Sequence, residues 1–303
     1  MSVDYISNLA MVTSAALYLL ALIAYAAKWA SGRALLTEGM KPSRAQVDAD
    51  EKARFGLDLW GRIGIALACL GLATHLVGVI GRGIAANRAP WGNMYEFITS
   101  ALVAVVALFV YLAIAKGADW LGLPVMLLAA LGQGLAVTVF YVAVGPLVPA
   151  LHSVFFVVHI LAAITAAGAF NIGAIAAILY LLKARAEKRG PVKGYLAKLP
   201  SAEVLDRFSY RATLFGFPIW TFTIAAGAVW AQYAWGRFWG WDPKETWSFI
   251  TWVVYAGYLH ARLTAGWKGR RAAIVAIIGV ATFWFNFVGI NLLVSGLHSY
   301  GKG

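Results

Sequence analysis

Apolar runs of about 20 residues recur along the whole chain, and they constrain its fold more than any other feature. Each run is long enough to cross a bilayer as an α-helix. Of the 303 residues, 61% are hydrophobic and only 13% are charged, whereas a soluble domain of this size needs far more polar surface. The sequence therefore predicts an all-α polytopic membrane protein with about eight transmembrane helices. We expect the spans at residues 8–28, 58–80, 94–115, 121–143, 153–182, 214–234, 248–264 and 272–296.

The motifs of the chain are distributed unequally between its halves. Residues 1–145 hold the first four expected spans, and residues 146–303 hold the other four together with the external loop 235–247. Within the second half, the basic segment 183–213 is expected to form an interfacial helix and a turn. We therefore predict an N-terminal group of four helices and a C-terminal group that carries the function.

Lysine and arginine are concentrated in alternate loops. One set of alternate loops, together with Arg62, holds 20 of the 25 basic residues. The other set holds only Arg82, Arg88, Arg237, Lys244 and Lys302. By the positive-inside rule the basic set is cytoplasmic, so both termini and the loop 235–247 are expected outside. Topology and anionic lipid headgroups account for the net charge of +12, so we expect a bilayer and no nucleic acid as a partner.

The single cysteine, Cys69, lies inside an expected span. The chain therefore has no CxxC motif, no disulfide framework and no cysteine-based metal site.

The Trp-rich loop, residues 235–247, reads WGRFWGWDPKETW and contains four tryptophans. Seven of the 13 tryptophans of the chain fall between residues 220 and 252, whereas an interfacial aromatic belt spreads its tryptophans over both interfaces. Gly236 and Gly240 allow a close approach of the backbone, so the loop is typical of a flat binding platform.

The second half of this loop also has the pattern of a capped helix start. Asp242 suits the N-cap, Pro243 the first helical position and Glu245 the third. Asp242 and Glu245 are accordingly interpreted as structural support for the loop, not as a catalytic pair.

The five histidines are divided between two expected depths. His75, His152, His159 and His298 lie at the outer level, near the Trp-rich loop, while His260 lies close to the cytoplasmic side. Spaced seven residues apart, His152 and His159 are expected on one helix face. A single intramembrane histidine is more often a packed hydrogen-bonding residue than a ligand. Their position beside tryptophans and cations nevertheless favours haem, which needs axial imidazoles.

From about residue 150 to 301 the chain resembles the CcsA/ResC family, also named CcsB, of System II cytochrome c biogenesis proteins, which carry a tryptophan-rich "WWD" domain. Four blocks in the same order carry the resemblance: LVPALHSVFFVVH, the long block that ends in WGRFWGWDPKETWSFITW, YLHARLTAGWKGR and GINLLVSGLHSYG. The first half matches mainly through WGNMYEF. Many relatives have a Gly-His-Phe-Pro stretch before that motif, where this chain reads NRAP, so the role of that histidine has no counterpart here.

The resemblance implies a haem-handling protein that works with a ResB-type membrane partner as a cytochrome c haem lyase (synthase). Haem b (protohaem) is expected between His159 and His298 at the external loop, and in transit at His260. The other expected haem-binding residues belong to the loop: Trp235, Gly236, Arg237, Trp239, Trp241, Asp242 and Lys244. The complex is expected to transport haem outward and to present it to the CxxCH motif of apocytochrome c.

The expected location is the bacterial plasma (inner) membrane, with the loop on the periplasmic side, or the thylakoid membrane in a plastid or cyanobacterium. Two other functions stay open. One is a haem exporter or chaperone that does not form the thioether bonds, and the other is a membrane b-type cytochrome that transfers electrons. The second alternative is disfavoured because only His260 lies deep. The sequence assigns no role to His75 or His152.

Overall fold

The structure, a computed structural model, describes residues 1–31, 44–146, 149–192, 194–294 and 296–297, with the backbone alone for 44–53. Throughout these residues the regular structure is helical, without a strand. The helices are α1 (Val3–Ser31), α2 (Arg44–Ala86), α3 (Met94–Lys116), η2 (Asp119–Leu121), α4 (Gly122–Thr138), η3 (Pro149–Leu151), α5 (Val154–Glu187), α6 (Tyr195–Lys198), α7 (Ala202–Trp235), α8 (Pro243–Leu263), α9 (Arg270–Trp284), the π-helical turn η4 (Phe285–Gly289) and α10 (Ile290–Leu293).

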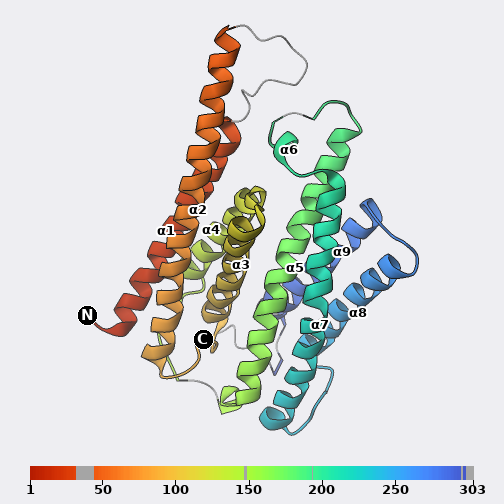
Figure 1. Cartoon of the computed structure of the whole chain (residues 1–303). Helices are drawn as coiled ribbons and strands as arrows, with labels where there is room; N and C mark the ends of the chain where they lie inside the picture. The colour runs from red at the N-terminus through yellow and green to blue at the C-terminus, as the bar shows by residue number, and fades with distance from the viewer. Residues whose placement is uncertain (32–43, 147–148, 193, 295, 298–303) are drawn as a thin grey trace.

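The long helices run alternately between the two ends of a bundle (Figure 1). The Trp-rich loop therefore lies at the end where α3 and α5 begin and α4 and α9 finish. Of the described helices, seven are long and apolar enough to cross a membrane. The prediction of an all-α polytopic membrane protein is confirmed. The remaining expected span, 248–264, corresponds to α8, which crosses the bundle beside the others but is not among those seven.

The predicted bounds of the segment between the fifth and sixth spans, residues 183–213, are wrong. α5 continues to Glu187 and α7 begins at Ala202, so only the four-residue helix α6 and its flanking turns separate them. The side chain of Ser201 caps α7 by accepting a hydrogen bond from the backbone amide of Val204 at 3.4 Å. This early cap extends α7 well beyond its apolar stretch.

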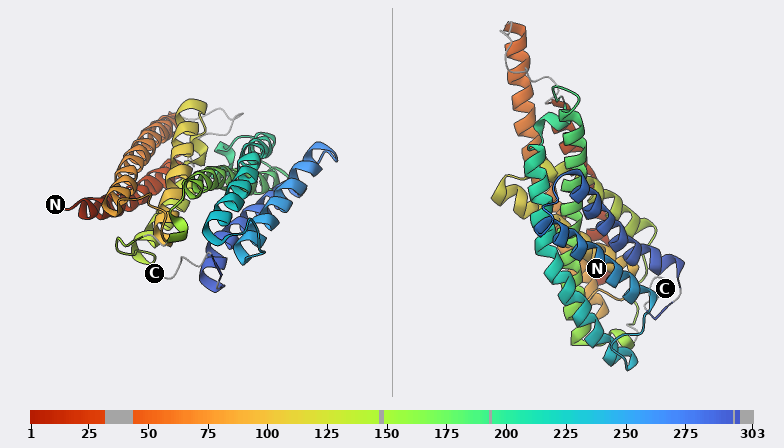
Figure 2. Two further views of the ribbon diagram at one scale, coloured as in Figure 1. Left: turned by 90° about the horizontal axis from the view of Figure 1, so that it is seen from below. Right: turned by 90° about the vertical axis from the view of Figure 1, so that its right-hand side faces the viewer.

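The helices pack as two groups that meet along α3 and α5 (Figures 1 and 2). In the first group α1 packs against α2 and α4, and α3 packs against α4. In the second, α5 packs against α7 and α9, while α8 packs against α9. The division of the chain at residue 145 stays a prediction, and the α3–α5 contact joins its two sides.

A buried ion cluster fixes α2 against the start of α3. The Glu96 carboxylate accepts hydrogen bonds from Arg82 Nε at 2.8 Å, from Arg88 Nη1 at 2.7 Å and from the Gly92 amide at 2.6 Å. The side chains of Arg82 and Glu96 are completely buried. Two of the few basic residues at this end are therefore neutralised inside the protein, which increases the charge asymmetry of its accessible surface.

The same cluster explains the burial of WGNMYEF. Trp91 and Tyr95 face the interior of the protein and are only 9% and 1% exposed. Trp91 Nε1 donates to Ser100 Oγ at 3.0 Å, and the Arg82 guanidinium lies over the Tyr95 ring at 5.4 Å from its centroid. Packing on the ion cluster thus draws both aromatic rings inward.

We predict that Glu96→Gln lowers the free energy of unfolding by about 3–5 kcal/mol, because Arg88 loses its buried counter-charge and Arg82 keeps only Asp4, whose Oδ1 lies 3.8 Å from Nη1. Thermal unfolding in detergent measures the effect. Glu203→Gln is the matched control: Glu203 pairs with Arg207 at 2.9 Å on an exposed helix surface, and its loss should cost at most about 1 kcal/mol. Equal effects of the two substitutions would show that the buried cluster is dispensable.

Candidate functional site

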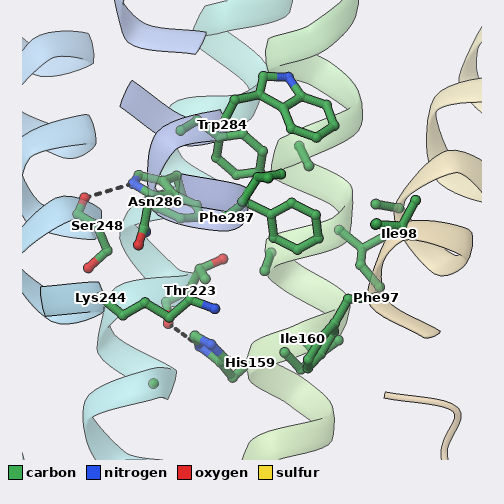
Figure 3. A pocket seen from close by; sticks show the side chains of 18 of the residues that line it. Phe97, Ile98, His159, Ile160, Thr223, Lys244, Ser248, Trp284, Asn286 and Phe287 are labelled. Carbon is green, nitrogen blue, oxygen red and sulfur yellow. Dashed lines mark hydrogen bonds between the residues drawn. The ribbon is translucent and has the colours of Figure 1, made fainter. Parts of the chain in front are cut away.

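An apolar cavity of about 540 Å³ lies between the two helical groups, at the end of the bundle that carries the Trp-rich loop (Figure 3). α3 and α4 line it on one side, and α5, α7, the end of α9, η4 and the first two turns of α8 line it on the other. Its volume is in the range of small-molecule and cofactor sites. An apolar wall with a few polar side chains can bind an amphiphilic ligand and fix its orientation.

His159, in the second turn of α5, is a polar side chain on the wall of this cavity. Its Nδ1 lies 2.8 Å from the backbone carbonyl oxygen of Thr223 on α7. Because a carbonyl can only accept, Nδ1 carries the proton, and the neutral ring has its lone pair on Nε2. The imidazole stacks on Trp230, with 5.9 Å between the ring centroids and 23° between the planes.

Gly227 on α7 makes room for the His159 ring. A Cβ atom at this position would lie 2.7 Å from Nδ1 of His159, closer than a side chain allows. α5 and α7 can therefore hold the imidazole in this orientation only because residue 227 has no side chain.

The Trp-rich loop is held by the Glu245 carboxylate. Glu245 Oε2 accepts hydrogen bonds from the amides of Gly240 at 2.8 Å and Asp242 at 3.1 Å, and Arg237 Nη1 lies 3.3 Å from Oε1. Asp242 Oδ1 accepts from the amide of Lys244 at 3.1 Å. The predicted helix start with Asp242 as N-cap and Glu245 as capping acid is confirmed.

The tryptophans of the loop face different surroundings and do not form one flat surface. Trp239 lines the cavity, and its ring is nearly perpendicular to that of Trp241, at 87°. Trp241 is 66% exposed, with φ of +58°. Trp235 packs on Trp230, with 4.9 Å between the ring centroids. The expected platform is thus divided, and Trp239 is the loop tryptophan that lines the cavity.

The two cations of the loop also differ in role. Arg237 is paired with Glu245, and its guanidinium occupies the space beside Gly240, where a Cβ atom would meet it at 1.6 Å. Lys244 instead lines the cavity (Figure 3). Lys244 is in the first turn of α8, outside the seven apolar helices, and burial lowers the pKa of its ammonium group to about 8 while Asp242 acts in the opposite direction. A carboxylate in the cavity would favour the charged form.

The two remaining expected iron ligands are His298 and His260. His298 is outside the described residues, but the amide of the preceding residue, Leu297, donates to Asp242 Oδ2 at 2.9 Å. The Trp-rich loop therefore anchors the segment that leads to His298. His260 is exposed near the end of α8, about 24 Å along the helix from Lys244 at 1.5 Å per residue. The structure brings together His159, Trp239 and Lys244, and the haem-binding roles of all these residues stay predictions.

The expectation that His152 and His159 share a helix face is wrong. α5 begins at Val154, with Ser153 as its N-cap, so His152 precedes the helix, and it is exposed. His75 is completely buried, and its Nδ1 lies 3.0 Å from the hydroxyl of Tyr18.

The sequence analysis did not identify Thr223, Gly227 or Asn286. The first acts through its backbone and the second through its lack of a side chain, so neither had a signal in one sequence. Asn286 did have a signal, because an amide in an apolar span is costly and usually faces the protein interior. It lines the cavity from η4.

A family model described as "Cytochrome C assembly protein" matches residues 88–298, which include the cavity, the Trp-rich loop and α8. The chain belongs to this family. It is similar to "Cytochrome c biogenesis protein CcsA" of Guillardia theta, at 37% identity over 78% of this chain and 83% of that protein. A protein with the same description from Gloeobacter violaceus is 34% identical over 73% of this chain and 80% of the relative.

A solved structure described as "Cytochrome c Heme Lyase CcmF" has a similar fold, with a TM-score of 0.56. The match covers 95% of this chain and 47% of the other, at 17% identity, and so shows the fold alone. The predicted CcsA relationship is confirmed, and the protein is a multi-pass membrane protein with a role in cytochrome c biogenesis.

We predict that Glu245→Ala accelerates hydrogen exchange at the amides of Gly240 and Asp242, because both lose their acceptor. Hydrogen–deuterium exchange of the protein in detergent measures this change. Glu203→Ala, in the first turn of α7, is the control and should leave the loop amides unchanged. Unaltered exchange in Glu245→Ala would mean that the loop is held by other contacts.

Proposed function

We propose that this protein binds haem b in the cavity beside the Trp-rich loop and presents it, on the outer side of the membrane, to apocytochrome c. The observation that carries the proposal is His159 on the wall of an apolar cavity, with its proton directed to the Thr223 carbonyl. This is the tautomer that an iron ligand needs, because a hydrogen bond at Nδ1 leaves Nε2 as the coordinating atom.

The residues around His159 suit a porphyrin and not a bare metal ion. The walls from α3, α4, α5 and α7 are apolar, as the faces and edges of a macrocycle require. In the part of the chain that the structure describes, no three His, Cys, Asp or Glu side chains form a metal-binding group. The four pyrrole nitrogens of haem supply most of the ligands, so one or two axial imidazoles suffice.

His298 is our candidate for the second axial ligand. The contact between the Leu297 amide and Asp242 holds the segment before His298 at the N-cap of α8, close to Lys244 on the cavity wall. Asp242 would thereby couple the Trp-rich loop to the second ligand.

His260 would bind haem on its way from the cytoplasmic side. Its exposed position on α8 suits a shared site with another subunit, and a ResB-type membrane protein is the proposed partner. Arg262, two residues after His260, is bound by Asp206: its Nη1 donates to the two carboxylate oxygens at 2.8 Å and 2.9 Å. His260 would therefore act without this arginine.

In the attachment reaction the two cysteine thiols of the apocytochrome CxxCH motif would add across the haem vinyl groups. For each thioether, one S–H bond and the π bond of one vinyl C=C break while one S–C and one C–H bond form. The contribution of this chain is to hold haem in one orientation while the substrate histidine replaces one axial ligand. The chain would then be a subunit of a haem lyase complex. Release of free haem without covalent product from a reconstituted complex would favour an exporter instead.

We predict that His159→Ala loses haem, or that its spectrum changes from six-coordinate low-spin haem, while added imidazole restores the low-spin spectrum. His152→Ala, at the same end of the protein and exposed, should keep the haem content and spectrum of the wild type. Optical spectra of protein purified from haem-replete membranes measure both. The proposal is wrong if His159→Ala and His152→Ala both retain the wild-type spectrum.

We also predict that Gly227→Ala alters the haem spectrum, because the new methyl group displaces the His159 ring from the Thr223 carbonyl. Gly257→Ala is the matched control: it places the same methyl group in open space on α8 and should have no effect. A normal haem spectrum in Gly227→Ala would contradict the described position of His159.

A further inference from the structure

Two polar side chains on the cavity wall, Lys244 and Asn286, form what we call the polar corner; the neighbouring Glu245 carboxylate also lines the cavity but is bound by the Trp-rich loop. Lys244 projects from the first turn of α8 and Asn286 from η4, and both line the cavity (Figure 3). π-Helical turns such as η4 occur often at functional sites, because they reorient side chains that an α-helix would direct elsewhere.

Most other polar side chains that line the cavity already have partners. Asn171 donates from Nδ2 to the Ala167 carbonyl at 2.8 Å and accepts from Trp284 Nε1 at 2.9 Å. Ser248 Oγ donates to the Glu245 carbonyl at 2.7 Å, and Thr223 Oγ1 donates to the Ile219 carbonyl at 2.9 Å. Their hydrogen-bonding groups are satisfied by the fold, without a ligand.

The polar corner differs. Asn286 is 8% exposed, and its buried Oδ1 has no hydrogen-bond partner among the described residues. The structure likewise gives Lys244 Nζ no hydrogen bond or ion pair within the part of the chain that it describes. A buried amide oxygen that lacks a partner destabilises the folded protein, and a ligand that binds Asn286 recovers that free energy. Lys244, which is half-buried, adds a positive charge on the wall of the same cavity.

We propose that Lys244 and Asn286 bind one carboxylate of the ligand in the cavity, so that haem enters with a propionate directed at the start of α8 and η4. This inference rests on the proposed haem-binding function. The ammonium group and the side-chain amide can both donate to a carboxylate, because the oxygen and nitrogen of an amide are interchangeable by rotation. Lys244 and Asn286 are thus positioning residues that determine which edge of the macrocycle faces inward, while His159 binds the iron.

The stability of the haem-free protein gives a first test. If Asn286 serves a ligand, Asn286→Leu removes an unsatisfied amide and raises the melting temperature by a few degrees. Asn171→Leu is the matched control in the same cavity and lowers it, because Trp284 Nε1 loses its acceptor. A fall in the melting temperature of Asn286→Leu equal to that of Asn171→Leu would overturn the proposal, since it would show that Asn286 serves the fold.

Binding of haem and of haem dimethyl ester to the purified full-length protein in detergent gives the second test. The wild type should bind free haem roughly tenfold to a hundredfold more tightly than the ester, which lacks carboxylates. Lys244→Met and Asn286→Leu should lose much of this preference while keeping their affinity for the ester. Variants that retain the full preference, or a wild type that binds both porphyrins equally, would overturn the proposal. Failure of the wild type to bind either porphyrin would instead contradict the proposed haem-binding function.

Discussion

The Glu245 carboxylate is the contact on which the arrangement of the site depends. It binds two amides of the Trp-rich loop and the Arg237 side chain, and it belongs to the first turn of α8. One acidic group therefore fixes the direction of the loop and the start of the helix together. As a result Trp239 and Lys244 line the cavity, and Asp242 remains available to accept from Leu297. The polar loop and the apolar helices are a single structural unit.

The cavity arises where the two helical groups meet. Helices of one group pack closely because their apolar faces match, but α3 and α4 do not fill the space beside α5 and α7. The polar groups on the wall are few and fall into two kinds. Those of Asn171, Ser248 and Thr223 hold the protein together, whereas His159, Lys244 and Asn286 have the chemistry to recognise an iron porphyrin with acidic side chains. The role of the protein in cytochrome c biogenesis is consistent with such a site.

The parts of the fold that depend on local sequence could be predicted. Apolar runs determine the spans, and the capping box at Asp242 needs only residues that are close in sequence. Features that depend on contacts between residues far apart in the sequence could not be predicted. The Arg82–Glu96 pair buries Tyr95, although a tyrosine at the end of a span, taken by itself, is typical of a membrane interface. Likewise, helix periodicity cannot show that Ser153 starts α5 after His152. The cavity itself requires the relative placement of six helices, α3, α4, α5, α7, α8 and α9, which no single motif specifies.

The position of the iron in a haem-loaded structure tests the account most directly. An experimental map of the protein with haem, with iron located by its anomalous scattering, would show the metal, its ligands and the orientation of the macrocycle. We predict iron at bonding distance from His159 Nε2, with the macrocycle in the cavity between α3, α4, α5 and α7. Iron distant from His159, with the macrocycle outside the cavity against the exposed Trp241 or at His260 alone, would contradict the account.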